Sequence, residues 1–84
     1  MLNIAYSQAA AKQMTRLPGN TGQRLPAKIN AYAADPQASH GWATSFGGGI
    51  VRIRQGDYRA VCRVDHAAKT LAVHEVGHRR EVYR

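Results

Sequence analysis

Acidic residues, cysteines and long apolar runs are all scarce in this sequence. It has five Asp and Glu against twelve Lys and Arg, and its single cysteine, Cys62, cannot form an intrachain disulfide. No N-terminal stretch resembles a signal peptide and no apolar run approaches the length of a membrane span, so we expect a cytoplasmic protein. The shortage of acids leaves a formal net charge of +7 on 84 residues. That excess favours a polyanionic or acidic partner.

Motifs for metal binding and for nucleophilic catalysis are also lacking. His74 and His78 are close in sequence, but their spacing on a strand and turn does not bring two imidazoles to one ion, and Cys62 has no second cysteine beside it. We expect Cys62 to point into the core, away from any substrate. Residues 46–49 are Gly-rich, but neither a Lys-Ser/Thr pair nor a helix follows them, which excludes a phosphate loop. No metal and no cofactor are therefore expected.

The first half of the chain has the spacing of two helices. Ser7 is expected to cap the first, which Pro18–Gly19 should end. The second should begin at about Thr21, carry Pro26 in its first turn and end at Asp35–Pro36. Residues at helical spacing that should face the core are Ala10, Met14, Leu17, Leu25, Ile29 and Tyr32.

The second half has the alternation of strands. Strands are predicted at residues 1–6, 50–54, 58–64 and 71–76. The segment before residue 50 is predicted to be a loop in which Trp42 and Phe46 anchor the chain under or beside the sheet. The sequence therefore predicts one α+β domain over residues 1–84, in the order β-α-α-β-β-β, with two helices packed on one face of an antiparallel sheet.

Patterning also fixes the register of the hairpin that follows residue 50. A two-residue loop at Gly56–Asp57 keeps both apolar sets on one side, whereas a three-residue loop would mix the faces. The buried set is then Val51, Ile53, Cys62 and Val64. The open face then carries Arg52, Arg54, Arg59 and Arg63. Arg54 stands directly opposite Arg59, although facing like charges destabilise a sheet. A bound phosphate backbone or an acidic partner would explain this pairing, and a plain solvated face is the alternative.

Charged and titratable side chains are concentrated in the last eleven positions of the chain. Their concentration at a strand end predicts an anion site, for phosphate in particular, because a core does not accept unpaired cations. We interpret His74 as a hydrogen-bonded, partly buried strand residue. His78 is expected to be functional, since it follows Gly77 where the strand ends. The cations and rings of this segment are His74, His78, Arg79, Arg80, Tyr83 and Arg84.

Three segments resemble a known family. They are Val-Arg-Ile-Arg-Gln-Gly-Asp-Tyr-Arg-Ala-Val at 51–61, Val-Gly-His-Arg-Arg-Glu-Val-Tyr-Arg at 76–84, and Ala-Ala-Asp-Pro at 33–36. With the predicted order of elements, they resemble the RelE/ParE superfamily of toxins from bacterial type II toxin-antitoxin systems. The resemblance implies a small basic toxin held inactive by an acidic antitoxin. On the RelE side it implies an endoribonuclease that cuts messenger RNA in the ribosomal A site, and on the ParE side a non-hydrolytic inhibitor of DNA gyrase.

The resemblance also suggests roles for single residues. Arg59 matches the family arginine that holds the scissile phosphate, Arg79 the second catalytic arginine, and Tyr83 the tyrosine that stacks on a base. This set favours the nuclease, since members of the ParE branch lack it, and a plain RNA-binding module is a third alternative. Further RNA contacts are expected from Arg52, Arg54, Arg63, Arg80 and Arg84.

The proton-transfer group is where the sequence departs from RelE. Arg52 and Arg54 stand where RelE has two lysines of its basic strand, and a guanidinium stays protonated where a lysine can accept a proton. If the 2′-hydroxyl attacks the adjacent phosphate, another group must then take its proton. His78 is the first candidate and Glu81 the second.

Overall fold

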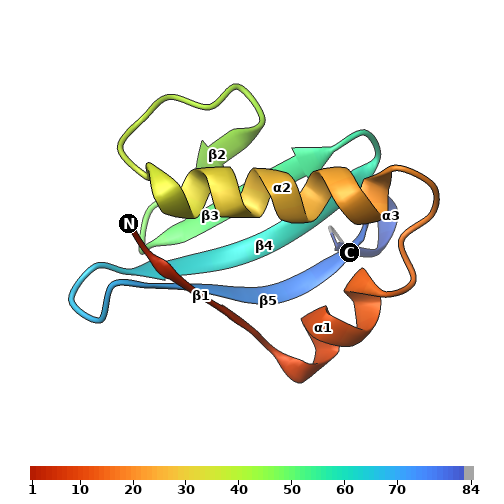
Figure 1. The fold of residues 1–84 in the computed structure, drawn as a ribbon, viewed down its shortest axis with the longest axis horizontal. Helices are drawn as coiled ribbons and strands as arrows, with labels where there is room; N and C mark the ends of the chain where they lie inside the picture. The colour runs from red at the N-terminus through yellow and green to blue at the C-terminus, as the bar shows by residue number, and fades with distance from the viewer. Residues whose placement is uncertain (83–84) are drawn as a thin grey trace.

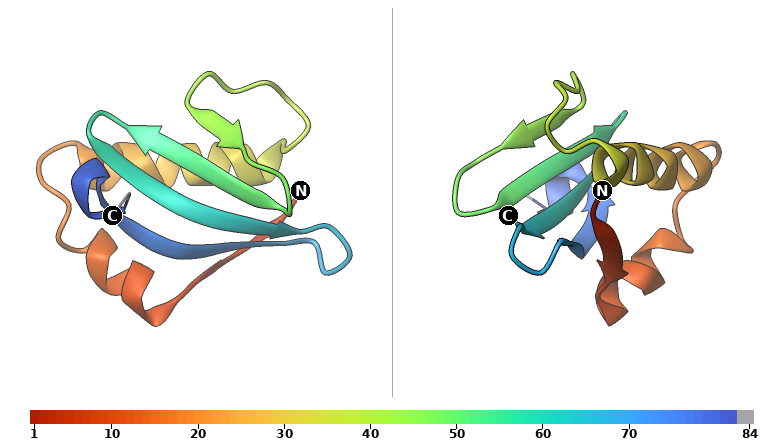
Figure 2. Two further views of the ribbon diagram at one scale, coloured as in Figure 1. Left: turned by 180° about the vertical axis from the view of Figure 1, so that it is seen from behind. Right: turned by 60° about the vertical axis from the view of Figure 1, so that its left-hand side comes forward.

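Five strands form one sheet, and α2 lies across one of its faces (Figure 1). The computed structural model describes residues 1–82. The strands are β1 (Asn3–Tyr6), β2 (Ala43–Ser45), β3 (Ile50–Gln55), β4 (Tyr58–Asp65) and β5 (Thr70–His78), and the helices are α1 (Gln8–Met14), α2 (Thr21–Ala34) and α3 (Arg79–Val82). Seen from behind, β3 and β4 are covered by neither α1 nor α2 (Figure 2). The predicted α+β class, with helices on one face of a sheet, is confirmed.

The sheet is mixed, which corrects the prediction of a wholly antiparallel one. Its strand order is β1-β5-β4-β3-β2. The pairs β2–β3, β3–β4 and β4–β5 are antiparallel, whereas β1 runs parallel to β5, with Ile4 opposite Leu71. A period-two pattern shows which side of a strand is buried but does not encode the direction of its partner, so the parallel pairing of β1 with β5 could not be predicted from it.

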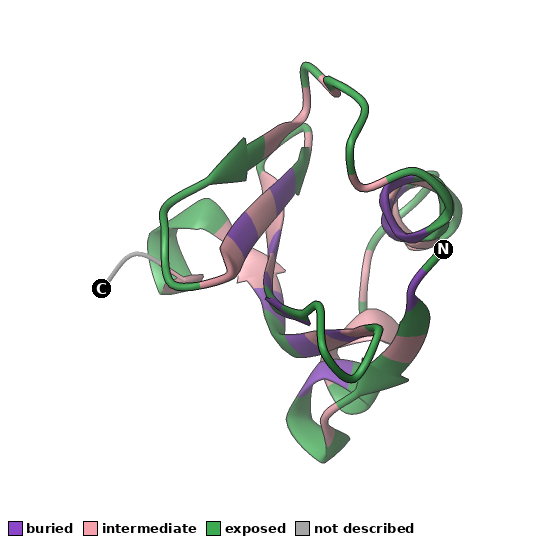
Figure 3. Cartoon of the chain, turned by 90° about the vertical axis from the view of Figure 1, so that its left-hand side faces the viewer, coloured by how far each residue is buried: buried purple, intermediate pink, exposed green. Residues whose placement is uncertain are grey.

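The β3–β4 hairpin has the predicted register. Arg54 pairs with Arg59 and Ile53 with Ala60 around the two-residue loop Gly56–Asp57. Gly56 has φ +58°, a left-handed conformation that glycine adopts without the steric cost of a Cβ. Buried residues consequently alternate along both strands with residues that are partly buried or exposed (Figure 3).

A β-bulge interrupts the pairing of β4 with β5. Val61 pairs with Glu75 but Cys62 pairs with Val73, so His74 is the extra residue on β5. The bulge lets Val73 and the later Val76 both face the core, although their odd spacing would otherwise set them on opposite faces. It also leaves the His74 side chain exposed, which corrects our expectation of a partly buried histidine.

The helices begin where expected, but one end and one proline differ from the prediction. Ser7 caps α1, its Oγ accepting a hydrogen bond from the Ala10 N–H at 2.9 Å. α1 ends at Met14, so Leu17 lies in the following turn. Pro26 is the sixth residue of α2 and not in its first turn, and the helix continues through it without a hydrogen bond to the Gly22 carbonyl. Among the helices of residues 1–82, none is both long and apolar enough to cross a membrane.

The core lies between α2 and the sheet and contains most of the predicted residues. Those confirmed as buried are Ala10, Leu25, Ile29, Tyr32, Val51, Ile53, Cys62 and Val64. Met14 and Leu17 pack against this core but are only partly buried. Burial raises the pKa of the Cys62 thiol to about 12, so it is a packed, protonated side chain, as expected.

The segment before β3 differs most from its prediction as a loop. Residues 43–45 form the short edge strand β2, paired with β3. Trp42 is half-buried and packs beside the core as predicted, but Phe46 is 54% exposed, so its prediction as an anchor is wrong. A three-residue edge strand carries too little alternation for sequence analysis to detect.

Candidate functional site

Four arginine side chains lie on the sheet face opposite α2, as the register predicted. They are Arg52 and Arg54 on β3 and Arg59 and Arg63 on β4. The Arg52 guanidinium lies 4.5 Å from the centre of the exposed Phe46 ring, a cation–π contact that accounts for a phenyl ring on this face. Arg63 Nη2 donates to the Gly48 carbonyl oxygen at 3.4 Å. Aromatic and cationic groups therefore share one open surface.

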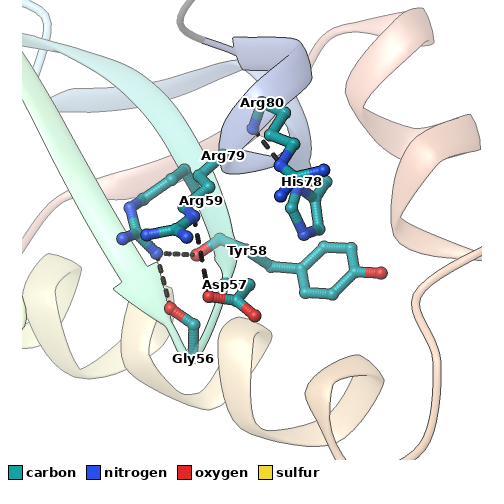
Figure 4. A network of polar contacts seen from close by, with 7 residues as sticks. All are labelled: Gly56, Asp57, Tyr58, Arg59, His78, Arg79 and Arg80. Carbon is teal, nitrogen blue, oxygen red and sulfur yellow. Dashed lines mark hydrogen bonds and ion pairs between the residues drawn. The ribbon is translucent and has the colours of Figure 1, made fainter.

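Arg59 and Arg79 meet over the hairpin loop (Figure 4). Arg59 Nη1 donates to the carbonyl oxygens of Gly56 at 2.7 Å and Tyr58 at 3.0 Å. The Arg79 backbone N–H donates to the Asp57 carbonyl at 2.7 Å, and its Nε lies 3.8 Å from Asp57 Oδ1. The Arg79 and Asp57 side chains are 54% and 65% exposed, so this ion pair is weak and leaves the Arg79 guanidinium able to bind another anion.

His78 lies apart from these two arginines. It pairs with Tyr58, and the two rings make an edge-on contact with centres 5.4 Å apart. Arg59 pairs with Gly77, one position along, so the side chains of Tyr58 and His78 point to the opposite face from Arg59. Figure 4 shows the same separation, with Arg80 beside His78. The Arg80 N–H donates to His78 Nδ1 at 3.2 Å, which requires a neutral imidazole with its proton on Nε2.

Glu81, in contrast, reaches the face of the sheet that carries Arg59. A Cβ added at Gly77 would lie 3.4 Å from Val82 Cγ2 and 3.6 Å from Glu81 Oε2, so α3 packs directly over the glycine. Because Gly77 is the strand partner of Arg59, this contact brings the Glu81 carboxylate to the arginine face of the sheet. Of the two candidate bases, Glu81 therefore lies on the same face of the sheet as the arginines and His78 does not.

A hollow of about 320 Å³ opens beside these arginines. Its lining comes from the loop before β2 and from β2, β3 and β4: Gly41, Trp42, Thr44, Arg52, Arg54 and Arg59. Sequence reasoning found the three arginines but missed Trp42 and Thr44 as site residues. The available signal was the aromatic residue near a basic strand, which we interpreted as packing.

Two predicted site residues, Tyr83 and Arg84, lie outside the described residues. Within residues 1–82, no group of three or more His, Cys, Asp and Glu side chains is arranged to hold a metal ion. The described surface offers guanidinium groups that can bind an anion, with the Glu81 carboxylate on the same face of the sheet.

Comparisons with known proteins agree with this fold. Residues 4–83 match the family model described as "ParE toxin of type II toxin-antitoxin system, parDE". No sequence among the curated proteins matches significantly.

Solved structures give a close match in fold at low identity. The isolated Escherichia coli RelE toxin is 21% identical, with 99% of this chain and 92% of that chain covered and a TM-score of 0.78. RelE in the archaeal RelE–RelB complex of Pyrococcus horikoshii is 18% identical, with coverages of 93% and 94% and a TM-score of 0.76. The YoeB/ParE toxin of Agrobacterium tumefaciens is 17% identical, with coverages of 92% and 98% and a TM-score of 0.73.

The family match spans nearly the whole chain and includes the strands and the helix that carry Arg59 and Arg79. The matched structures share the arrangement of sheet and helices. The chain thus belongs to the family of ParE toxins of type II toxin-antitoxin systems, and it shares the fold of the RelE toxin.

Proposed function

We propose that this toxin is an endoribonuclease that cleaves messenger RNA on the ribosome and so inhibits translation. The observation that carries the proposal is the convergence of Arg59 and Arg79 at the Gly56–Asp57 turn, on an open face that holds further arginines. Planar, permanently charged donors that meet at one exposed point suit a phosphate better than any packing role.

The proposed reaction is attack of a ribose 2′-hydroxyl on the adjacent phosphorus, with loss of the 5′-oxygen of the next nucleotide. The products are a 2′,3′-cyclic phosphate and a 5′-hydroxyl, whose proton is taken from water. Arg59 and Arg79 bind the non-bridging oxygens and stabilise the charge that develops in the pentavalent transition state. Arg52, Arg54 and Arg63 neutralise flanking phosphates. Tyr83 stacks on a base, as the resemblance implies. Arg80 and Arg84 stay predictions as RNA contacts.

Proton transfer in this scheme is assigned to Glu81. Its carboxylate packs over Gly77, opposite Arg59 in the sheet, whereas His78 faces Tyr58 on the other side of the strand. A base must reach the proton that it removes, so position is weighed before acidity. His78 as the base stays the competing prediction, and the two residues are separated experimentally below.

An acidic antitoxin is the proposed partner. RelE relatives have been crystallised with RelB antitoxins, including those of Pyrococcus horikoshii and Methanococcus jannaschii. A net charge of +7 favours an acidic segment, and binding to the folded state would stabilise a small domain by mass action. Expression of this chain alone should then arrest growth, and co-expression with a neighbouring small acidic protein should restore it.

A second candidate function is non-hydrolytic inhibition of DNA gyrase. It is favoured by the matching family model, which is that of ParE toxins. This candidate predicts that toxicity does not depend on Arg59 and Arg79 as phosphate ligands. A plain RNA-binding module is the third candidate, and it predicts binding without cleavage.

The test is to induce the toxin in cells and map RNA 5′ ends, with a gyrase supercoiling assay on the purified protein in parallel. The proposal predicts new 5′ ends within coding regions and unchanged supercoiling. Arg59→Ala should remove the new ends, and Arg16→Ala, which deletes an exposed cation after α1, should not. Toxicity without new 5′ ends and with blocked supercoiling would contradict the proposal and favour the gyrase inhibitor.

A further inference from the structure

A second hollow lies beside the first and shares a wall with it. It has a volume of about 410 Å³ and is lined by Lys28, Gly41, Trp42, Arg54 and Gly56. Gly41, Trp42 and Arg54 also line the 320 Å³ hollow that contains Arg59. The two hollows therefore form one trough, which runs from Arg59 past Trp42 to Lys28 on α2. We call it the Trp42 trough.

Positive charge accumulates along this trough without a carboxylate in its lining. Lys28 Nζ donates to the Arg54 carbonyl at 3.1 Å, which holds the ammonium next to β3. Partial burial, then the Arg54 and Arg24 charges, lower the pKa of Lys28, so the like charges repel one another here. The linings of both hollows contain Lys28, Arg52, Arg54 and Arg59 but no Asp or Glu. An anionic ligand would relieve this repulsion.

Trp42 belongs to the lining of both hollows and is held in place by its neighbours. Its indole stacks on the His40 ring with centres 4.6 Å apart and an interplanar angle of 29°. His40 Nε2 is in turn 3.0 Å from the Asp35 carbonyl oxygen, and its ring centre is 5.9 Å from that of Tyr32. Lys28 Nζ lies 5.8 Å from the centre of the indole. An ordered aromatic ring among cations is the composition of grooves that bind single-stranded nucleic acid.

The size of the hollows restricts what can enter. Each lies at the lower end of the range for small-ligand sites, roughly 300 to 1,000 Å³, which suits one nucleotide and not a duplex. A base reaches an aromatic side chain only when it is unstacked, which single-stranded RNA allows. The trough starts at Arg59, the proposed ligand of the scissile phosphate, so a strand leaving that point can follow it directly.

We propose that the Trp42 trough binds the single-stranded RNA segment next to the scissile phosphate, with Trp42 against a base and Lys28 bound to the following phosphate. This inference deepens the proposed function and rests on it for the position of the scissile phosphate. It assigns a binding role to Lys28 and Trp42, which lie outside the arginine pair proposed to carry the chemistry.

Trp42 is the only tryptophan of the chain, so its fluorescence reports on the trough directly. The experiment titrates the full-length protein with a ten-nucleotide single-stranded RNA carrying 2′-O-methyl groups, which lacks the attacking hydroxyl and cannot be cleaved. Binding is followed independently by the anisotropy of a dye on the same oligonucleotide. Saturable quenching of Trp42 emission at the concentrations where anisotropy rises is the expected result.

Two variants and a matched control complete the test. Trp42→Leu should weaken binding about tenfold, on the scale of one base–aromatic stack. Lys28→Gln should weaken it about fivefold and reduce its salt dependence by about one phosphate contact. Lys28 is at the surface of α2 and its substitution keeps the helix, so the test does not depend on a folded Trp42 variant. Lys12→Gln, an equal loss of charge on α1, should leave the affinity unchanged.

Unchanged Trp42 emission while the RNA is bound, equal affinities of the Lys28 and Lys12 variants, or no RNA binding at all would each overturn the inference. Quenching by duplex DNA and not by RNA would also overturn it. Its failure is distinct from that of the proposed function. If Arg59→Ala abolishes RNA cleavage in cells but Trp42 emission does not respond to RNA, the proposed nuclease function stands and the proposed role of the trough is rejected. RNA binding in the trough without any cleavage in cells would support the trough as an RNA site and contradict the proposed nuclease.

Discussion

The two faces of the sheet are built by the same strands but are governed by different forces. On the face toward α2, Ile53 and Ala60 are fully buried and neighbour one another across the hairpin. On the other face, one residue along, Arg54 stands opposite Arg59. The first pair stabilises the fold by burying apolar surface, whereas the second opposes it by repulsion. The buried face therefore stabilises the domain, and the arginine face is the site of its proposed function.

Ile53→Ala should have the largest effect on stability. It removes fully buried apolar volume from the centre of the sheet, which should lower the free energy of unfolding by about 2–5 kcal/mol. Urea unfolding followed by circular dichroism measures this change. Arg52→Ala, one position away on the other face, is the control and should cost far less. Equal losses of unfolding free energy in the two variants would contradict the claim that the buried face carries the stability.

Arg59→Ala and Arg79→Ala should have the largest effect on activity. Each removes one donor to the transition state, so cleavage should slow by about 10²- to 10³-fold while the unfolding midpoint changes little. The rate is measured by single-turnover cleavage of messenger RNA on programmed ribosomes. If both variants cleave at the normal rate, the arginine pair is not the site.

Substituting each of the two candidate bases in turn tests the difference between the two faces of the sheet, because Glu81 and His78 lie on different faces. Glu81→Gln should slow cleavage by about 10²-fold, as expected for loss of a general base. His78→Gln should leave the rate and its pH dependence between pH 5.5 and 7.5 nearly unchanged, since the imidazole faces Tyr58. The reverse result would restore His78 as the proton acceptor and reject Glu81.

The close contact of α3 with Gly77 gives a graded test of how Glu81 is positioned. Gly77→Ala should be tolerated, because its Cβ would meet Val82 and Glu81 at ordinary contact distances of 3.4 and 3.6 Å. Gly77→Val adds two methyl groups and should push α3 outward, slowing cleavage about tenfold without unfolding the protein. Normal cleavage by the valine variant would show that the contact does not position the carboxylate.

The smallest effect is expected from Arg54→Ala. Removing one of the two facing charges should raise the free energy of unfolding by about 0.2–1 kcal/mol at low salt, and the gain should shrink as salt is added. Arg63→Ala is the matched control, because Arg63 pairs with Ile50 and Ala72 and has no like charge opposite. A loss of stability in Arg54→Ala would show that this pair does not oppose folding.

The parts of the fold that sequence predicts well are those where several constraints agree. The β3–β4 register followed from two alternating strands and a loop with a glycine in its first position. A three-residue loop would have mixed the apolar and charged faces of the hairpin. The parallel partner of β1 and the bulge at His74 could not be predicted, because each depends on contacts between the two ends of the chain. One such contact is the hydrogen bond that Ser7 Oγ donates to the His74 carbonyl, which joins residues 67 positions apart in the sequence.

The candidate site was predictable in part for the same reason. Arg59 and the cations after Gly77 stand in short, recognisable motifs. Lys28 and Trp42 do not, because the trough joins α2 to β3 through a contact between residues 26 positions apart. The sequence does not show on which side of β5 His78 lies. The bulge adds one residue to β5, and this reverses the face on which every later residue of the strand lies.

The most direct test of the account is cleavage of messenger RNA on purified, programmed ribosomes by the wild-type toxin, Arg59→Ala and Arg16→Ala at equal concentrations. We expect cleavage by the wild type and Arg16→Ala at similar rates, and a rate lower by about 10²- to 10³-fold for Arg59→Ala with ribosome binding retained. Full cleavage by Arg59→Ala, or no cleavage by the wild type, would contradict the claim that the arginine face of the sheet is an RNA-cleaving site.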